Sequence, residues 1–233
     1  VALNAVSFLL AAGAVHFGVH ERHVHRRTQQ VEINSISGLR TIRADTRLRM
    51  LTLLALIGSI AVLPEAVIVP LVRELGAPNW VMGPLLAADP LGFLIGARLV
   101  SKRCTPERQQ AMIGPLAVGC LAAQTMFVLH PPPVLAGLLL MISGAGASYV
   151  PLIRGEVVEL APKEITGAVT GWVRTALRAG SGAAAVGGGL LAQLLGSAAA
   201  AIALASAVGT LCAIAVATQW HRVRGTSTQV VTT

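Results

Sequence analysis

The chain has 233 residues, of which 54% are hydrophobic and 12% are charged. Soluble domains carry about 25% charged residues, so this chain has too few charges to cover a water-exposed surface, and a soluble globular protein is excluded. An aromatic content of 3% together with 24 glycines disfavours a transmembrane β-barrel with aromatic girdles. The composition therefore predicts an all-α integral membrane protein whose helices pack through small residues.

Seven stretches are apolar and long enough to cross a bilayer, which takes about 20 residues in a helix. In chain order they are residues 1–19, 50–70, 80–99, 111–129, 134–153, 167–191 and 198–218. Short polar or proline-rich breaks separate the last six, so neighbouring helices are expected to run antiparallel. The sequence thus predicts seven transmembrane helices in four parts. These are the last helix of an otherwise missing N-terminal bundle (1–19), an interdomain loop (20–49), a C-terminal six-helix bundle (50–218) and a tail (219–233).

Lys and Arg predict the orientation of the helices, because short loops rich in these residues stay in the cytoplasm. Four segments are basic: 20–49, the loop with Lys102, Arg103 and Arg108, the loop with Arg154 and Lys163, and the tail. The opposite loops carry only Arg73. This asymmetry accounts for the net charge of +8. The sequence predicts a multi-pass protein of the cell membrane with a cytoplasmic C-terminus.

Segment 20–49 is the one long loop of the predicted topology, and it has two interpretations. Apolar residues recur among polar ones at Val31, Ile33, Ile36, Leu39 and Ile42. This pattern is typical of an amphipathic segment lying along the inner leaflet, where anionic lipids attract Arg. A solvated linker between two halves of a larger protein is the alternative. Nucleic-acid binding is not expected, because no soluble domain remains to carry a groove or an aromatic platform.

The sequence contains no complete motif of an enzyme, a metal site or a cofactor site. Four histidines cluster near the N-terminus: His16, His20, His23 and His25. They do not form the metalloprotease pattern, because Val24 stands where that pattern requires its second histidine. The three cysteines have no paired spacing, and no phosphate-binding loop with its Gly-Lys pair occurs. The sequence predicts a protein that is not an enzyme and has no cofactor or metal.

Ionisable side chains inside the predicted spans are functional candidates, because each costs about 2.5–3.5 kcal/mol to insert. They are Glu65, Asp89, Arg174 and Arg178. Each acid adjoins a proline, Pro64 or Pro90, and a proline removes the hydrogen bond to the carbonyl four residues earlier. A protonated carboxyl could donate to such an oxygen and an ionised one could not, which predicts a proton-dependent kink. The alternative is a structural hydrogen bond of fixed protonation state.

Arg174 and Arg178 are four residues apart and share one helical face. Arg178 falls near the predicted depth of Asp89, so we expect these two residues to form an ion pair. For Arg174 the alternative is snorkelling to the inner membrane interface. The same span is rich in glycine, which predicts close helix packing. Polar residues in other spans either contact a substrate or form interhelical hydrogen bonds; these are Gln124, Ser143, Ser148 and Tyr149.

A family resemblance rests on the stretch from Gly92 to Arg103. It resembles the degenerate copy of the major facilitator superfamily loop signature, Gly-x-x-x-Asp-Arg-x-Gly-Arg-Arg, but lacks its acid. The matching gating-loop residues are Gly92, Gly96, Arg98, Lys102 and Arg103. Four further stretches, LPEA at 63–66, ELG at 74–76, LAADPLG at 86–92 and IGPLAV at 113–118, are similar to actinobacterial members of this superfamily that are presumed exporters.

The resemblance implies a twelve-helix transporter with two six-helix halves around a central cavity. This chain would supply the second half and the end of the first, with the missing N-terminal half as its partner. The expected function is proton-coupled efflux of small, largely apolar compounds by alternating access, with a small-molecule substrate, protons and the lipid bilayer as further partners. The alternative is a non-transporting membrane subunit or truncated remnant that packs against another helical bundle.

Overall fold

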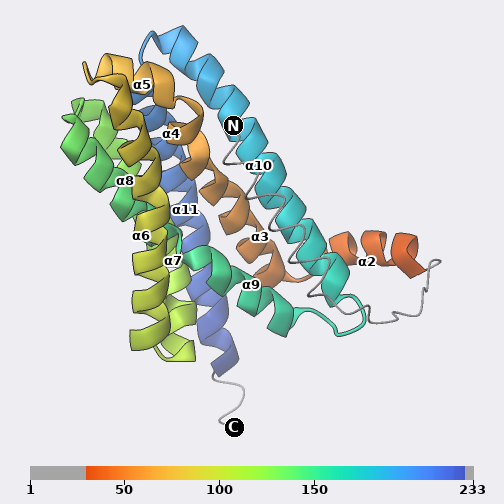
Figure 1. The fold of residues 1–233 in the computed structure, drawn as a ribbon. Helices are drawn as coiled ribbons and strands as arrows, with labels where there is room; N and C mark the ends of the chain where they lie inside the picture. The colour runs from red at the N-terminus through yellow and green to blue at the C-terminus, as the bar shows by residue number, and fades with distance from the viewer. Residues whose placement is uncertain (1–29, 229–233) are drawn as a thin grey trace, which may run out of the picture. The chain divides into compact units, whose positions relative to one another are not determined.

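The protein is described by a computed structural model that covers residues 30–228, of which residues 34–228 form one compact unit (Figure 1). All regular secondary structure in the described residues is helical. Among them, five segments are long and apolar enough to cross a membrane: Thr46–Ala66, Asn79–Arg103, Pro106–Leu129, Pro133–Leu160 and Ala198–Trp220. The chain is therefore an all-α membrane protein, as the composition predicts. The predicted span 1–19 and the histidine cluster lie outside the described residues.

The segment that begins the bundle is broken into four pieces. The side chain of Asp45 accepts hydrogen bonds from the backbone N–H of Arg47 at 2.7 Å and of Leu48 at 3.3 Å. Such an N-cap fixes the start of a helix. The helix therefore starts at Thr46, four residues before the predicted start at residue 50. The pieces in chain order are α3 (Thr46–Gly58), the 3₁₀ turn η1 (Ser59–Val62), α4 (Leu63–Ala66) and α5 (Ile68–Glu74). The break therefore falls around Pro64, where the sequence predicts a kink.

The remaining elements are mostly long helices joined by short turns. They are η2 (Asn79–Val81), α6 (Met82–Arg103), α7 (Pro106–Thr125), η3 (Met126–Leu129), α8 (Pro133–Ala147), α9 (Tyr149–Leu160), α10 (Thr166–Leu195) and α11 (Ala198–Thr228). α6 runs through Pro90 as one continuous helix. Gly196, with φ of 66°, makes the left-handed turn between α10 and α11. α11 continues to Thr228, past the last membrane-crossing segment, which ends at Trp220; the cytoplasmic tail stays a prediction.

Helix α10 covers the predicted span 167–191 and extends beyond both of its ends. It is absent from the five membrane-crossing segments found among the described residues, because its glycines, Gln193 and two arginines lower its hydropathy. Of its glycines, Gly180 packs against Ser59 and Gly188 against Leu63, whereas Gly171 is exposed with open space beside it. Close packing therefore uses one face of α10 and leaves the face of Gly171 open.

Two apolar clusters form the core of the bundle. One lies toward the end that carries Lys102, Arg103, Arg108 and Lys163, which we call the basic end; its largest members are Leu48, Leu51, Leu54, Tyr149, Ile153 and Trp220. The other lies toward the opposite end and includes Leu63, Leu71, Leu85, Phe127, Leu140 and Ile202. Burial of such side chains supplies the main packing contacts between the helices.

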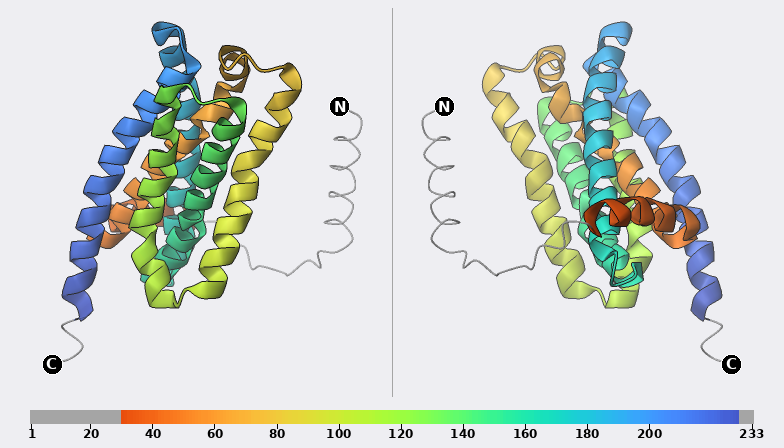
Figure 2. Two further views of the ribbon diagram at one scale, coloured as in Figure 1. Left: turned by 90° about the vertical axis from the view of Figure 1, so that its left-hand side faces the viewer. Right: turned by 90° about the vertical axis from the view of Figure 1, so that its right-hand side faces the viewer.

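Helix α2 (Gln30–Ala44) occupies half of the segment predicted as an interdomain loop. Of the apolar residues in the predicted pattern, Ile42 is buried and Ile36 is 69% exposed. Its Gly38 packs against Ala168 at the start of α10. Figure 2 shows α2 running across the long helices rather than along them. The stretch from Gln30 to Ala44 is therefore helical; its position along the inner leaflet and its role as a solvated linker both stay predictions.

Candidate functional site

The two acids predicted inside the spans line one small cavity. Glu65 comes from α4 and Asp89 from α6, and the cavity between them has a volume of about 10 Å³, close to the room that a single water needs. Apolar side chains and Pro64 form the rest of its lining, including Ile68, Leu85 and Leu140. Asp89 is half-buried and Glu65 is exposed. The structure therefore brings together two carboxyl groups that are 24 positions apart in the sequence.

Of the two prolines predicted to kink their helices, Pro64 lines this cavity and Pro90 lies inside the continuous helix α6. Pro64 stands in the first turn of α4, just after η1 ends at Val62. Leu86 also lines the cavity, and its carbonyl has lost its usual helical donor because Pro90 has no N–H. A carboxyl group and a backbone oxygen without its helical partner thus belong to the same site.

The predicted ion pair between Asp89 and Arg178 is wrong. Within the described residues, the side chains of Asp89 and Arg178 do not form an ion pair within 4.0 Å. The physical reason is the packing order, since α6 packs mainly against α8 whereas α10 packs against α3, η1, α4 and α11. Equal depth in the membrane does not place two residues on facing helices.

A buried polar network lies between the two apolar clusters. The side-chain nitrogen of Gln124 donates to the hydroxyl of Ser143 at 2.9 Å and to the carbonyl of Ala61 at 3.0 Å. The hydroxyl of Ser206 donates to the side-chain oxygen of Gln124 at 3.0 Å. Gln124 therefore ties α7 to α8, α11 and the carbonyl of η1 just before the break at Pro64. The interhelical alternative is confirmed for Gln124 and Ser143.

The other two polar candidates behave differently. Tyr149 is buried and donates to the carbonyl of Leu54 at 3.3 Å, a second interhelical hydrogen bond. The hydroxyl of Ser148 is buried and has no hydrogen-bond partner in the part of the chain that the structure describes. Neither residue lines the acid cavity.

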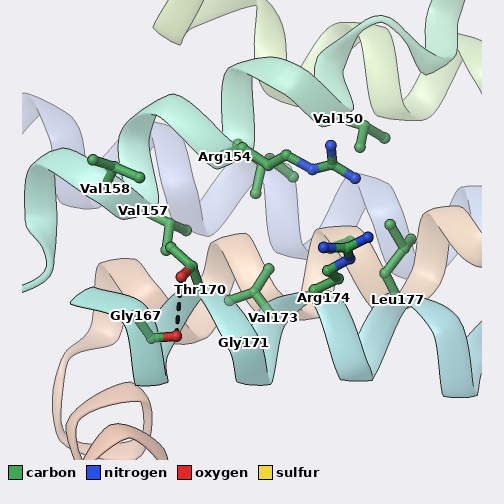
Figure 3. A pocket seen from close by; sticks show the side chains of 12 residues that line it. Val150, Arg154, Val157, Val158, Gly167, Thr170, Gly171, Val173, Arg174 and Leu177 are labelled. Carbon is green, nitrogen blue, oxygen red and sulfur yellow. Dashed lines mark hydrogen bonds between the residues drawn. The ribbon is translucent and has the colours of Figure 1, made fainter. Parts of the chain in front are cut away.

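A second and larger hollow lies between α9 and α10, with a volume of about 510 Å³. Arg174 and Thr170 of α10 and Arg154 of α9 line it, and Figure 3 shows the two guanidinium groups extending into it from facing helices. The sequence predicts Arg154 in a cytoplasmic loop, whereas the structure places it on α9, beside the hollow. Arg178, one helical turn beyond Arg174, does not line the hollow.

The predicted gating-loop signature lies on a helix. α6 contains Gly92, Gly96, Arg98 and Lys102 and ends at Arg103. Basic residues favour the C-terminus of a helix. Continuation of the helix through Thr105 is disfavoured, because Thr105 precedes Pro106, which starts α7. A side chain at Gly92 or Gly96 would overlap the backbone of α8. Within α6 the two glycines therefore permit close helix contact, and Arg98, Lys102 and Arg103 are exposed.

At the opposite end of the bundle, Glu74 caps the last helix. Its carboxylate accepts hydrogen bonds from the hydroxyl of Ser197 at 2.5 Å and from the backbone N–H of Ala198 at 2.7 Å and of Ala199 at 3.2 Å. His130 lies 3.2 Å from the same carboxylate. Partial burial opposes ionisation, but these hydrogen bonds and His130 outweigh it and hold the pKa of Glu74 below its ordinary value of 4.5. No sequence motif for helix capping reveals this contact, because its partners are far apart in the chain.

The Glu74→Gln variant should be less stable by about 1 kcal/mol, the usual worth of a helix cap. Because folding lowers the pKa of Glu74, its contribution is complete above pH 4.5 and is lost as the pH falls below that value through the folded-state pKa. Thermal unfolding in detergent between about pH 3 and 7 measures both effects. Glu159→Gln, at an exposed position on α9, is the control. Identical pH dependence of Glu74→Gln and the wild type would contradict the assignment.

These features define a helical membrane protein with a broken helix, two acids at the break and an arginine-lined hollow. Comparison of the chain with protein-family models, curated proteins and solved structures finds no match.

Proposed function

We propose that the protein is a secondary active transporter of the major facilitator superfamily, whose bundle described above is the C-terminal half. In this proposal it exports small, largely apolar compounds from the cell by alternating access, coupled to protons. It lies in the cell membrane with its basic end and C-terminus in the cytoplasm, and a second six-helix half packs against it. The resemblance of residues 63–66, 86–92 and 92–103 to that superfamily motivates the assignment to this family.

The single observation that carries the proposal is the acid cavity at the break of the first helix. Carboxyl groups inside a membrane protein are costly and mark ion or proton pathways. Helices interrupted near such groups are typical of secondary transporters, since the interrupted backbone offers polar groups where a substrate or ion binds. Glu65 and Asp89 line a cavity beside Pro64, which combines both features.

A proton-dependent step follows from the chemistry of this cavity. Two ionised carboxylates in one small cavity repel each other, and binding of a proton to one of them removes that repulsion. The protonated carboxyl of Asp89 then becomes a donor, and the carbonyl of Leu86, a residue that lines the same cavity, lacks a helical donor because of Pro90. Loss of the proton removes the donor, so the interactions across the cavity between α4 and α6 change with the protonation state.

The test uses the full-length protein in proteoliposomes with an imposed pH gradient and two probes, ethidium and 1-octanesulfonate. The gradient is expected to drive accumulation of at least one probe, and a proton ionophore is expected to abolish that accumulation. Equal flux with and without the gradient would exclude proton coupling. Flux no greater than that of protein-free vesicles would favour a non-transporting membrane subunit.

A further inference from the structure

We propose that the hollow between α9 and α10 binds a small amphipathic organic anion, whose acidic oxygens contact Arg154 and Arg174 and whose apolar part lies on the aliphatic wall. This proposal names a substrate class and therefore rests on the proposed transport function. The hollow has a volume of about 510 Å³, within the range of about 300–1,000 Å³ that small-molecule sites occupy.

The two arginines lie at similar depths from the same end of the bundle. α9 ends at Leu160 and α10 begins at Thr166, so the two helices run back from one short turn. Arg154 is six residues before Leu160, and Arg174 is eight residues after Thr166. At about 1.5 Å per residue these positions are about 9 and 12 Å from the turn. The two guanidinium groups therefore lie at similar depths, and Figure 3 shows both of them in the space between α9 and α10.

The charge of the hollow is uncompensated. Its twelve lining residues include these two arginines and no acid. Within the described residues, neither Arg154 nor Arg174 has a carboxylate partner within 4.0 Å. Two like charges that extend into one hollow repel each other, and the planar guanidinium fork is matched to the oxygens of a carboxylate, sulfonate or phosphate. An anion that bridges the arginines removes the repulsion.

The remaining wall favours an apolar body on that anion. It consists mostly of aliphatic side chains and glycines, namely Ala55, Val150, Ile153, Val157, Val158, Gly167, Gly171, Val173 and Leu177. The hydroxyl of Thr170 already donates to the carbonyls of Thr166 and Gly167, so it offers the ligand no free hydrogen. The hollow also lies toward the basic end, the proposed cytoplasmic side, where an exporter collects its substrate.

Direct binding tests the proposal on the full-length protein in phosphatidylcholine nanodiscs. Equilibrium dialysis measures labelled 1-octanesulfonate, with octyltrimethylammonium as the cationic probe and protein-free nanodiscs as background. We expect octanesulfonate to bind in preference to the cation. Arg154→Gln and Arg174→Gln should each weaken this binding about ten-fold or more, the worth of a hydrogen bond to a charged group. Arg108→Gln makes the same charge change at an exposed position outside the hollow and should change binding less than about two-fold.

A second pair of variants tests the hollow without removing charge. Gly171 lines it and has open space at its Cβ position, so Gly171→Leu fills the hollow and should weaken octanesulfonate binding. Gly187→Leu is the matched control, because Gly187 is an exposed glycine of the same helix, also with open space, that does not line the hollow. Thermal unfolding of each variant verifies that the fold is kept.

The outcomes separate the possible sources of the anion. Binding that is insensitive to both arginine substitutions, or equal for the cationic probe, would overturn the proposal. Addition of phosphatidylglycerol to the nanodiscs tests whether the anion is a lipid headgroup. Arginine-dependent retention of this lipid without octanesulfonate binding would overturn the proposal that the ligand is a soluble anion. Gradient-driven ethidium flux without octanesulfonate binding would reject only the anion site. Arginine-dependent binding without flux of either probe would reject only transport.

Discussion

The Asp89→Asn variant is expected to lose pH-gradient-driven flux down to the level of protein-free vesicles. Asparagine keeps the size of the side chain but binds no proton, so the cavity no longer switches between two protonation states. Exchange of labelled for unlabelled probe without a gradient should persist, because that reaction needs no net proton movement. The measurement is flux of the probe that the wild type accumulates, with and without the gradient.

The neighbouring acid should have a smaller effect. Glu65 is exposed whereas Asp89 is half-buried, so Glu65→Gln should reduce gradient-driven flux only in part. Glu164→Gln alters an exposed acid in the turn between α9 and α10 and should leave the flux unchanged. Wild-type gradient-driven flux in Asp89→Asn would show that the coupling proton binds elsewhere. Loss of both exchange and gradient-driven flux would indicate a structural role for Asp89.

The Gly144→Ala variant is expected to be strongly destabilised, by about 1–3 kcal/mol, the usual cost of overpacking. α6 packs chiefly against α8, and a Cβ atom at Gly144 would overlap the carbonyl oxygen of Asp89. Because this overlap is with backbone, side-chain rotation cannot relieve it, and the two helices must move apart. The displacement should also disturb the acid cavity. Thermal unfolding in detergent measures the loss of stability.

A matched substitution on the same helix separates overpacking from helix propensity. The Cβ of Gly137→Ala would lie 3.6 Å from a methyl of Leu85, an ordinary contact. This variant should be as stable as the wild type or slightly more so, because alanine is a better helix former than glycine by about 1 kcal/mol. Equal stability of Gly144→Ala and Gly137→Ala would contradict the close approach of α6 and α8.

The membrane class could be predicted because hydropathy and length are local properties. Lipid cannot hydrogen-bond an open backbone, so a long apolar stretch has few choices other than a helix. Prolines and caps likewise act over a few residues, which is why the break near Pro64 was predicted correctly. The start of α3 was misplaced because Arg47 and Arg49 extend a helix into a stretch that hydropathy assigns to a loop.

The candidate sites were predicted less completely. Glu65 and Asp89 were recognised as costly charges, but their shared cavity was not foreseen. Arg178 was assigned to Asp89 by depth alone, although depth leaves the rotation of each helix undetermined. Arg154 was counted as a loop charge, because the sequence does not reveal that α9 extends past it to Leu160.

By itself the sequence determined the helical membrane class, the break at Pro64 and the presence of costly charges in the spans, since each follows from interactions within a few residues along the chain. Only the tertiary structure decided which charges share a site. Neighbours across the bundle depend on how closely helices approach, and that distance is set where Gly92, Gly96 and Gly144 allow backbones to touch. The close contact of α6 with α8 leaves Asp89 in one cavity with Glu65 and away from Arg178, and the turn that joins α9 and α10 places Arg154 and Arg174 on one hollow.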